Sequence, residues 1–238
     1  MKKESVKTIW IVTVFAIAMG FLEAAVVVYL RYLYYPAGFA FPLKGFIDPA
    51  VLGVEWVREF STIVMLVTIG MLAGKKVYSK FAYFIYSFAI WDIFYYVFLK
   101  MTLGWPESLL TMDMLFMIPW PWVGPVLAPV ICSIVMIGVA FFLIHYEDKG
   151  KKMRVKTLDV VLVLVGIGVI LYTWLVDYGQ ILINGRFLKD FFSLATNKEF
   201  ANLVASYMPL PYSWGFFILG VVISSIGLGL FCRRIIKK

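Results

Sequence analysis

Residues 8–30 have the sequence TIWIVTVFAIAMGFLEAAVVVYL, an apolar run that one charged side chain, Glu23, interrupts. A helix needs about 20 apolar residues to cross a hydrocarbon core about 30 Å thick. The run is therefore long enough to be a membrane-spanning helix. It is also longer than the apolar part of a cleaved signal peptide, which has about 7–15 residues.

Five further apolar runs predict five further spanning helices. The chain is 63% hydrophobic and 15% charged, whereas soluble domains are about 25% charged. We expect an all-α, polytopic bundle of six transmembrane helices. No soluble domain fits between them, so residues 1–238 are expected to form a single transmembrane domain. The expected spans are residues 8–32, 51–74, 77–101, 122–145, 158–178 and 213–232.

The basic residues lie on alternate connections between the spans. They concentrate before the first span, between the second and third, between the fourth and fifth, and after the last. This is the positive-inside pattern, in which cytoplasmic connections are rich in Lys and Arg. We therefore expect a multi-pass protein of the cell membrane with both termini cytoplasmic and residues 33–50, 102–121 and 179–212 outside. The same distribution accounts for the net charge of +8 and argues against a nucleic-acid partner.

Two external segments indicate short extra helices. Trp105-Pro106-Glu107-Ser108 is typical of a helix start, because proline is common at the first helical position and acids favour the first turn. Apolar residues 109–118 are too few to span, so we expect a re-entrant or interfacial half-helix before the fourth span. Residues 196–199, Thr-Asn-Lys-Glu, have capping-box spacing and predict a short amphipathic helix at the outer surface.

Prolines recur every four residues at the start of the fourth span, at Pro121, Pro125 and Pro129. Each lacks an N–H group and disturbs the helical hydrogen-bond ladder. We expect the start of this span to be kinked or unwound. Irregular backbone at membrane depth is tolerated where it is buried or lines a cavity.

Glu23 and Asp92 are carboxyl groups at membrane depth, in the first and third spans. Such a group costs at least ~2.5 kcal/mol on insertion scales, and it usually faces a protein interior or a water-filled cavity. Each acid is followed eight residues later by a base, Arg31 or Lys100. Eight residues are slightly more than two turns, so acid and base share a face about 12 Å apart along the axis.

The second span adds charges at a similar depth. Its uninterrupted apolar part, residues 60–74, covers only about 22 Å at 1.5 Å per residue, so the helix must include Glu55, Arg58 and Glu59. Their i, i+3, i+4 spacing places them on one face, which Thr62 continues. With two tyrosines on the face of Asp92 and an acid of the half-helix, they predict a ligand-binding polar cluster in the outer half of the bundle. Its expected members are Glu23, Arg31, Glu55, Arg58, Glu59, Asp92, Tyr95, Tyr96, Lys100 and Asp113.

Clustered acids support several kinds of chemistry. Their oxygens can hold a divalent cation, a pair can act as general acid and base, or they can form ion pairs that only hold helices together. The sequence contains no HExxH, GxSxG, SxxK or Walker motif. Because His145 is the single histidine, multi-histidine zinc or haem sites within the chain are excluded. The sequence identifies no cofactor.

Three segments resemble those of a family of prokaryotic six-span integral membrane proteins for which no activity is known. They are FLEAAVVVYLRYLYYP (residues 21–36), WDIFYYVFLK (91–100) and GWPESLLTMDMLFMIPWPWVGPVLAP (104–129). The resemblance covers roughly the first 140 residues and supports a prokaryotic cell membrane location. It implies no function.

The sequence leads to three functional hypotheses. The preferred one is an outward-facing intramembrane polar pocket that binds or moves an ion or a small polar solute, because acids at depth beside a proline-interrupted helix occur at transporter binding sites. The second is a membrane-embedded enzyme that acts at the outer leaflet on a lipid-linked or exported substrate. The third is a non-catalytic subunit or assembly factor of a membrane complex. The expected partners are the lipid bilayer and either a second copy, as a homodimer, or another subunit of a membrane complex.

Overall fold

Six long helices make up most of the protein. The computed structural model describes residues 1–43, 48–189, 194 and 197–237. Each of the six helices has the length and apolar composition needed to cross a membrane. The prediction of an all-α membrane protein with six spans is therefore confirmed by helix length and composition. The helices are α1 (Lys3–Tyr34), α2 (Pro49–Ala73), α3 (Val77–Leu103), α4 (Leu127–Asp148), α5 (Thr157–Asn184) and α7 (Trp214–Ile236).

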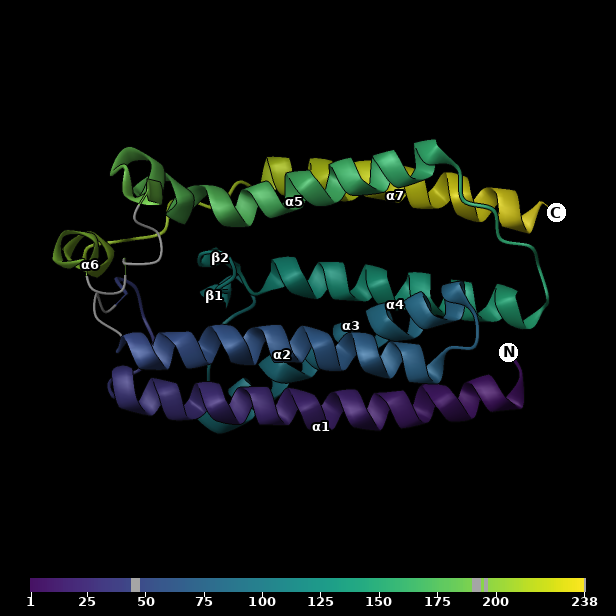
Figure 1. The fold of residues 1–238 in the computed structure, drawn as a ribbon, viewed down its shortest axis with the longest axis horizontal. Coiled ribbons are helices and arrows are strands. Elements are labelled where there is room, and N and C mark those ends of the chain that lie inside the picture. Colours follow the sequence, from purple (N-terminus) through teal and green to yellow (C-terminus); the bar gives the residue numbers. More distant parts are fainter. Residues whose placement is uncertain (44–47, 190–193, 195–196, 238) are drawn as a thin grey trace.

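The helix α3 is the centre of one group, in which it packs against α1, α2 and α4. The helices α5 and α7 form a close pair that runs alongside this group (Figure 1). Both chain termini and the α4–α5 connection lie at one end of the bundle, and Figure 1 shows the short elements that precede α4 and α7 at the other end. The basic residues predict that the end with the termini is cytoplasmic.

Glycines set how closely two pairs of helices approach. A Cβ atom added at Gly220 of α7 would lie 2.7 Å from the carbonyl oxygen of Gly166 on α5, so the backbones touch there. Small residues at such positions are typical of helix pairs in membranes. At Gly20 an added Cβ would lie 3.1 Å from the carbonyl oxygen of Trp91. This contact holds the segment of α1 that carries Glu23 against α3.

The prediction of a half-helix over residues 109–118 is wrong. The segment instead forms a hairpin, in which β1 (Met112–Phe116) pairs antiparallel with β2 (Trp122–Pro125). A short apolar run is ambiguous between helix and strand by its pattern alone, and Pro119 and Pro121 disfavour a continuing helix. The fourth span begins at Leu127, later than expected. The irregular backbone predicted for its start is present as the strand β2, which precedes the helix.

The helix α6 (Lys198–Ala205) is the short helix predicted from the capping-box spacing of residues 196–199. Its N-cap is Asn197, whose side chain accepts a hydrogen bond from the N–H of Phe200 at 3.1 Å. Thr196, the residue predicted to cap it, lies outside the described residues. Val204 is buried in a cluster with Tyr178 of α5, so α6 packs onto the end of α5.

Candidate functional site

A cavity of about 140 Å³ lies between α1, α2, α3 and β1, and we call it the acidic cavity. Its lining comes from the second half of α1 and the first half of α2, among other segments. The end of α1 and the start of α2 lie at the end of the bundle opposite the chain termini (Figure 1). Every residue of the expected polar cluster except Lys100 lines the acidic cavity. These lining residues are Glu23, Arg31, Glu55, Arg58, Glu59, Asp92, Tyr95, Tyr96 and Asp113.

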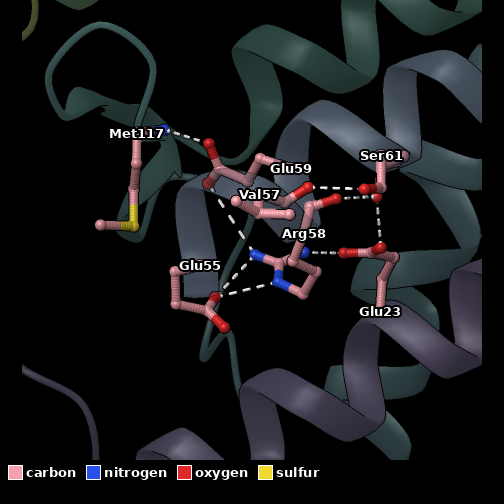
Figure 2. Close-up of polar contacts among 8 residues, drawn as sticks. Glu23, Glu55, Val57, Arg58, Glu59, Ser61 and Met117 are labelled. Carbon is pink, nitrogen blue, oxygen red and sulfur yellow. Dashed lines mark hydrogen bonds and ion pairs between the residues drawn. The ribbon is translucent and has the colours of Figure 1, made fainter. Parts of the chain in front are cut away.

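Arg58 on α2 is the centre of an ion-pair network in the cavity wall (Figure 2). Its guanidinium contacts the carboxylate of Glu23 on α1 and lies 2.9 Å from Glu55 Oε2. A third carboxylate, Glu59 Oε1, lies 3.8 Å from Arg58 Nη2. The predicted charged face of α2 is therefore real, and Glu55 and Glu59 are both buried on it.

Two further donors fix the carboxylates around Arg58. The hydroxyl of Thr62 donates a hydrogen bond to Glu23 Oε1, across the α1–α2 contact. The backbone N–H of Met117, which follows β1, donates to Glu59 Oε2 at 2.9 Å (Figure 2). The network therefore ties α1 to α2 and α2 to the hairpin.

Arg31 is held by elements other than its own helix. Its Nη2 lies 3.2 Å from Asp113 Oδ1, and its guanidinium carbon lies 3.6 Å from the ring centroid of Trp105 and 4.5 Å from that of Phe39. Arg31 is only 7% exposed, and its Nη1 is a buried donor with no hydrogen-bond partner among the described residues. Arg31 lines the acidic cavity, so a solute there could accept this bond.

Asp113 joins the cluster as the sequence suggested, but from a strand. It is 2% exposed, and the hydroxyl of Tyr96 donates to its Oδ2 at 3.3 Å. Burial raises the pKa of Asp113 to about 6, although the charge of Arg31 and hydrogen bonds from Met114 and Tyr96 act in the opposite direction. Burial therefore favours the protonated form of Asp113 more than it is favoured in a solvated aspartate.

Asp92 is the exception among the acids of the cavity. The hydroxyl of Ser133 on α4 donates to its Oδ2 at 2.8 Å. Within the described part of the chain, no Lys or Arg side chain forms an ion pair with it. The other four carboxyl groups of the cavity are each ion-paired with Arg58 or Arg31.

Lys100 does not join the cluster, which corrects the sequence prediction. Its Nζ donates to the backbone carbonyls of Gly104 at 2.9 Å and Pro106 at 2.8 Å. Lys100 lies in the last turn of α3, where carbonyl groups lack helical partners and attract cations. A separation of about 12 Å along the helix is too long for a direct bond to Asp92.

The cavity carries an excess of acid. Its lining includes five carboxyl groups and two guanidinium groups, so the ionised cavity favours a positively charged occupant. Across residues 1–43, 48–189, 194 and 197–237, no three His, Cys, Asp or Glu side chains lie close enough together to suggest a metal ion.

Four contributors to the site were not predicted. Phe39 and Trp105 stack on Arg31, Ser133 binds Asp92, and the N–H of Met117 binds Glu59. Ser133 had one usable signal, because a hydroxyl within an apolar span often marks a contact between helices. The contact of Met117 depends on the hairpin and had no signal in the sequence.

The chain matches no protein-family model, no curated protein and no solved structure. The resemblance of roughly its first 140 residues to prokaryotic six-span proteins therefore stays a prediction. The functional conclusion depends on the residues of the acidic cavity.

Proposed function

We propose that this integral membrane protein binds, and in its membrane moves, a small polar solute that carries a positive charge. The binding site is the acidic cavity, facing the outer side of the membrane. The observation that supports the proposal most is the carboxyl group of Asp92, which lies in the cavity wall and lacks a cationic partner among the described residues. The positive group of the solute would lie against Asp92.

The size of the cavity fits a small solute. One buried water needs roughly 10–15 Å³ of such space, so about 140 Å³ has room for several waters or a small organic cation. Drug-sized ligands occupy pockets of about 300–1,000 Å³. Arg31 Nη1 supplies a second polar contact, which an acceptor atom of the same solute would take.

The enzyme hypothesis has less support from this geometry. General acid–base catalysis by paired carboxyl groups would need two of them free to act on a substrate. Glu23, Glu55, Glu59 and Asp113 are each bound to an arginine, which leaves Asp92. A single carboxyl group without an arginine partner favours binding of a solute over acid–base catalysis.

A purely structural cluster is the second candidate, and the network of Arg58 supports it directly. Ion pairs that join α1, α2 and the hairpin would stabilise the bundle whether or not a solute binds. In that case Asp92 would have no role beyond its hydrogen bond with Ser133. The two candidates therefore differ in what happens when the charge of Asp92 is removed.

The proposal is tested by measuring the melting temperature of the full chain in nanodiscs with a small panel of compounds. The panel contains sodium, potassium, methylammonium and choline chlorides, zwitterionic glycine, and acetate as the anionic counterpart. We expect at least one cationic or zwitterionic compound to stabilise the wild type and Glu107→Gln, which removes an exposed acid outside the cavity. Asp92→Asn should lose this stabilisation. If no compound stabilises the wild type selectively, or Asp92→Asn responds equally, the structural candidate holds instead.

A further inference from the structure

A second cavity, which we call the basic cleft, is lined by residues of the α4–α5 connection, the start of α5 and the end of α7. Figure 1 shows these segments at the end of the bundle that carries both chain termini. The volume of the basic cleft is about 720 Å³. The α4–α5 connection and the first turn of α5 form one side, and the last turns of α7 form the other. The lining residues are Lys152, Arg154, Val155, Lys156, Thr157, Leu158, Arg234 and Ile235.

The polar lining of the basic cleft is cationic. Lys152, Arg154 and Lys156 are exposed side chains on one connection, and Arg234 faces them from α7. Arg234 Nη2 is ion-paired with the buried Asp159, which neutralises the acid nearest to the cleft. Arg234 Nε is a buried donor with no hydrogen-bond partner among the described residues.

The start of α5 adds to the positive field. Thr157 and Leu158 are its first residues, and the first N–H groups of a helix have no carbonyl partner within it. The helix dipole places a partial positive charge at the same point, which the carboxylate of Asp159 in the first turn partly offsets. Donors of this kind together with Lys and Arg suit the oxygens of a phosphate group.

Apolar side chains beside the charges indicate where such a phosphate would come from. Leu158 is 59% exposed and Val155 is 41% exposed, and both line the cleft. They lie where two spanning helices end, at the level expected for lipid headgroups. Basic pockets between spans at this level are typical binding sites for anionic lipid headgroups.

We infer that the basic cleft binds the phosphate of an anionic phospholipid, with Lys152, Arg154 and Arg234 around the headgroup and Val155 and Leu158 against the acyl chains. This site is separate from the acidic cavity and does not depend on the function proposed for it. It ties the α5–α7 pair to the lipid of one leaflet.

The test compares two double variants of the full chain that remove the same charge from the same connection. Lys152→Gln/Arg154→Gln changes two residues of the cleft, and Lys149→Gln/Lys151→Gln changes two neighbours that do not line it. Both keep the same count of basic residues, so their topology signals match. Native mass spectrometry measures lipid binding after delipidation, with phosphatidylglycerol, phosphatidylcholine and inorganic phosphate as separate probes.

We expect the wild type to bind phosphatidylglycerol in preference to phosphatidylcholine. Each basic residue near an anionic lipid contributes a factor of about five in affinity, so Lys152→Gln/Arg154→Gln should weaken binding by roughly 25-fold. Lys149→Gln/Lys151→Gln should weaken binding clearly less, because these side chains do not line the cleft. Equal losses in the two variants, or equal binding of the two lipids, would overturn the inference. Inorganic phosphate that competes fully with phosphatidylglycerol at similar concentration would also overturn it, because the source would then be a free anion.

Discussion

Arg58 on α2 is ion-paired with Glu23 on α1. The pair joins two helices that pack against α3 far more than against each other. It also forms part of the wall of the acidic cavity. The same groups therefore hold α1 and α2 together and determine the charge that a solute would meet.

Arg58→Gln should lower the free energy of unfolding by about 3–5 kcal/mol, because removing one partner of a buried pair leaves the other charges uncompensated. Unfolding in a mild detergent–urea series measures the loss. The double variant Arg58→Gln/Glu23→Gln should lose clearly less than the sum of the two single variants, since it removes both charges of one contact. Additive losses would show that the two side chains do not interact.

Lys75→Gln is the control for this measurement. Lys75 is ion-paired with Glu4 at 2.6 Å, but both side chains are largely exposed. Exposed pairs contribute little to stability, so this variant should unfold like the wild type. A loss as large as that of Arg58→Gln would mean that any lost ion pair destabilises this protein.

Asp113 predicts a specific dependence of stability on pH. Burial raises its pKa to about 6 from its ordinary value of about 3.8, so between these values the folded protein holds a proton that the unfolded chain has released. Stability from this group therefore falls as pH rises from about 4 to about 6 and is constant above that range. The melting temperature of the wild type relative to Asp113→Asn should show this fall. A difference that rises or stays flat over the same range would contradict the assignment.

The contact between α5 and α7 predicts a site that does not tolerate a larger residue. Gly220→Val should lower the free energy of unfolding by about 1–3 kcal/mol or more, because an added Cβ meets the backbone of Gly166. Gly229→Val on the same helix is the matched control, since nothing lies within 4 Å of a Cβ atom added there. Thermal melts of both variants in one detergent make the comparison, and equal melting temperatures would exclude the close approach.

Access to the acidic cavity predicts a difference in thiol labelling. The starting variant is Cys132→Ala/Cys232→Ala, which removes both native cysteines. Tyr95→Cys in this variant should react from the outer side with a membrane-impermeant cationic reagent faster than with its anionic counterpart, because Tyr95 lines the acidic cavity. Phe88→Cys, two turns along α3 and outside the cavity lining, is the control and should stay unreactive. Faster labelling of Tyr95→Cys by the anionic reagent would contradict an excess of negative charge.

The helices and the charged side chains of the cavity lining could be predicted because both follow local rules. Apolar length predicted six spans, and the i, i+3, i+4 spacing predicted the charged face of α2. The partners of Arg31 and Asp92 could not be predicted, because Asp113, Trp105 and Ser133 reach them from distant segments.

The β1–β2 hairpin could not be predicted from the sequence pattern. Residues 112–116 are apolar apart from Asp113 and were expected to be helical, yet they pair with β2. Asp113 is nevertheless in the cavity, because β1 forms one of its walls. Asp113 was predicted to join the cluster from a half-helix that returns toward the bundle, whereas the hairpin that carries it depends on pairing with β2, which the sequence does not specify.

The most direct test of the central claim is a calorimetric titration of the compound that best stabilises the protein into wild type, Asp92→Asn and Glu107→Gln in nanodiscs at fixed pH and salt. We predict saturable binding to the wild type and to Glu107→Gln. Affinity should be at least about tenfold lower for Asp92→Asn, because a hydrogen bond to a charged group contributes about 1.5–3 kcal/mol. Equal affinity of the wild type and Asp92→Asn would contradict a solute site at Asp92.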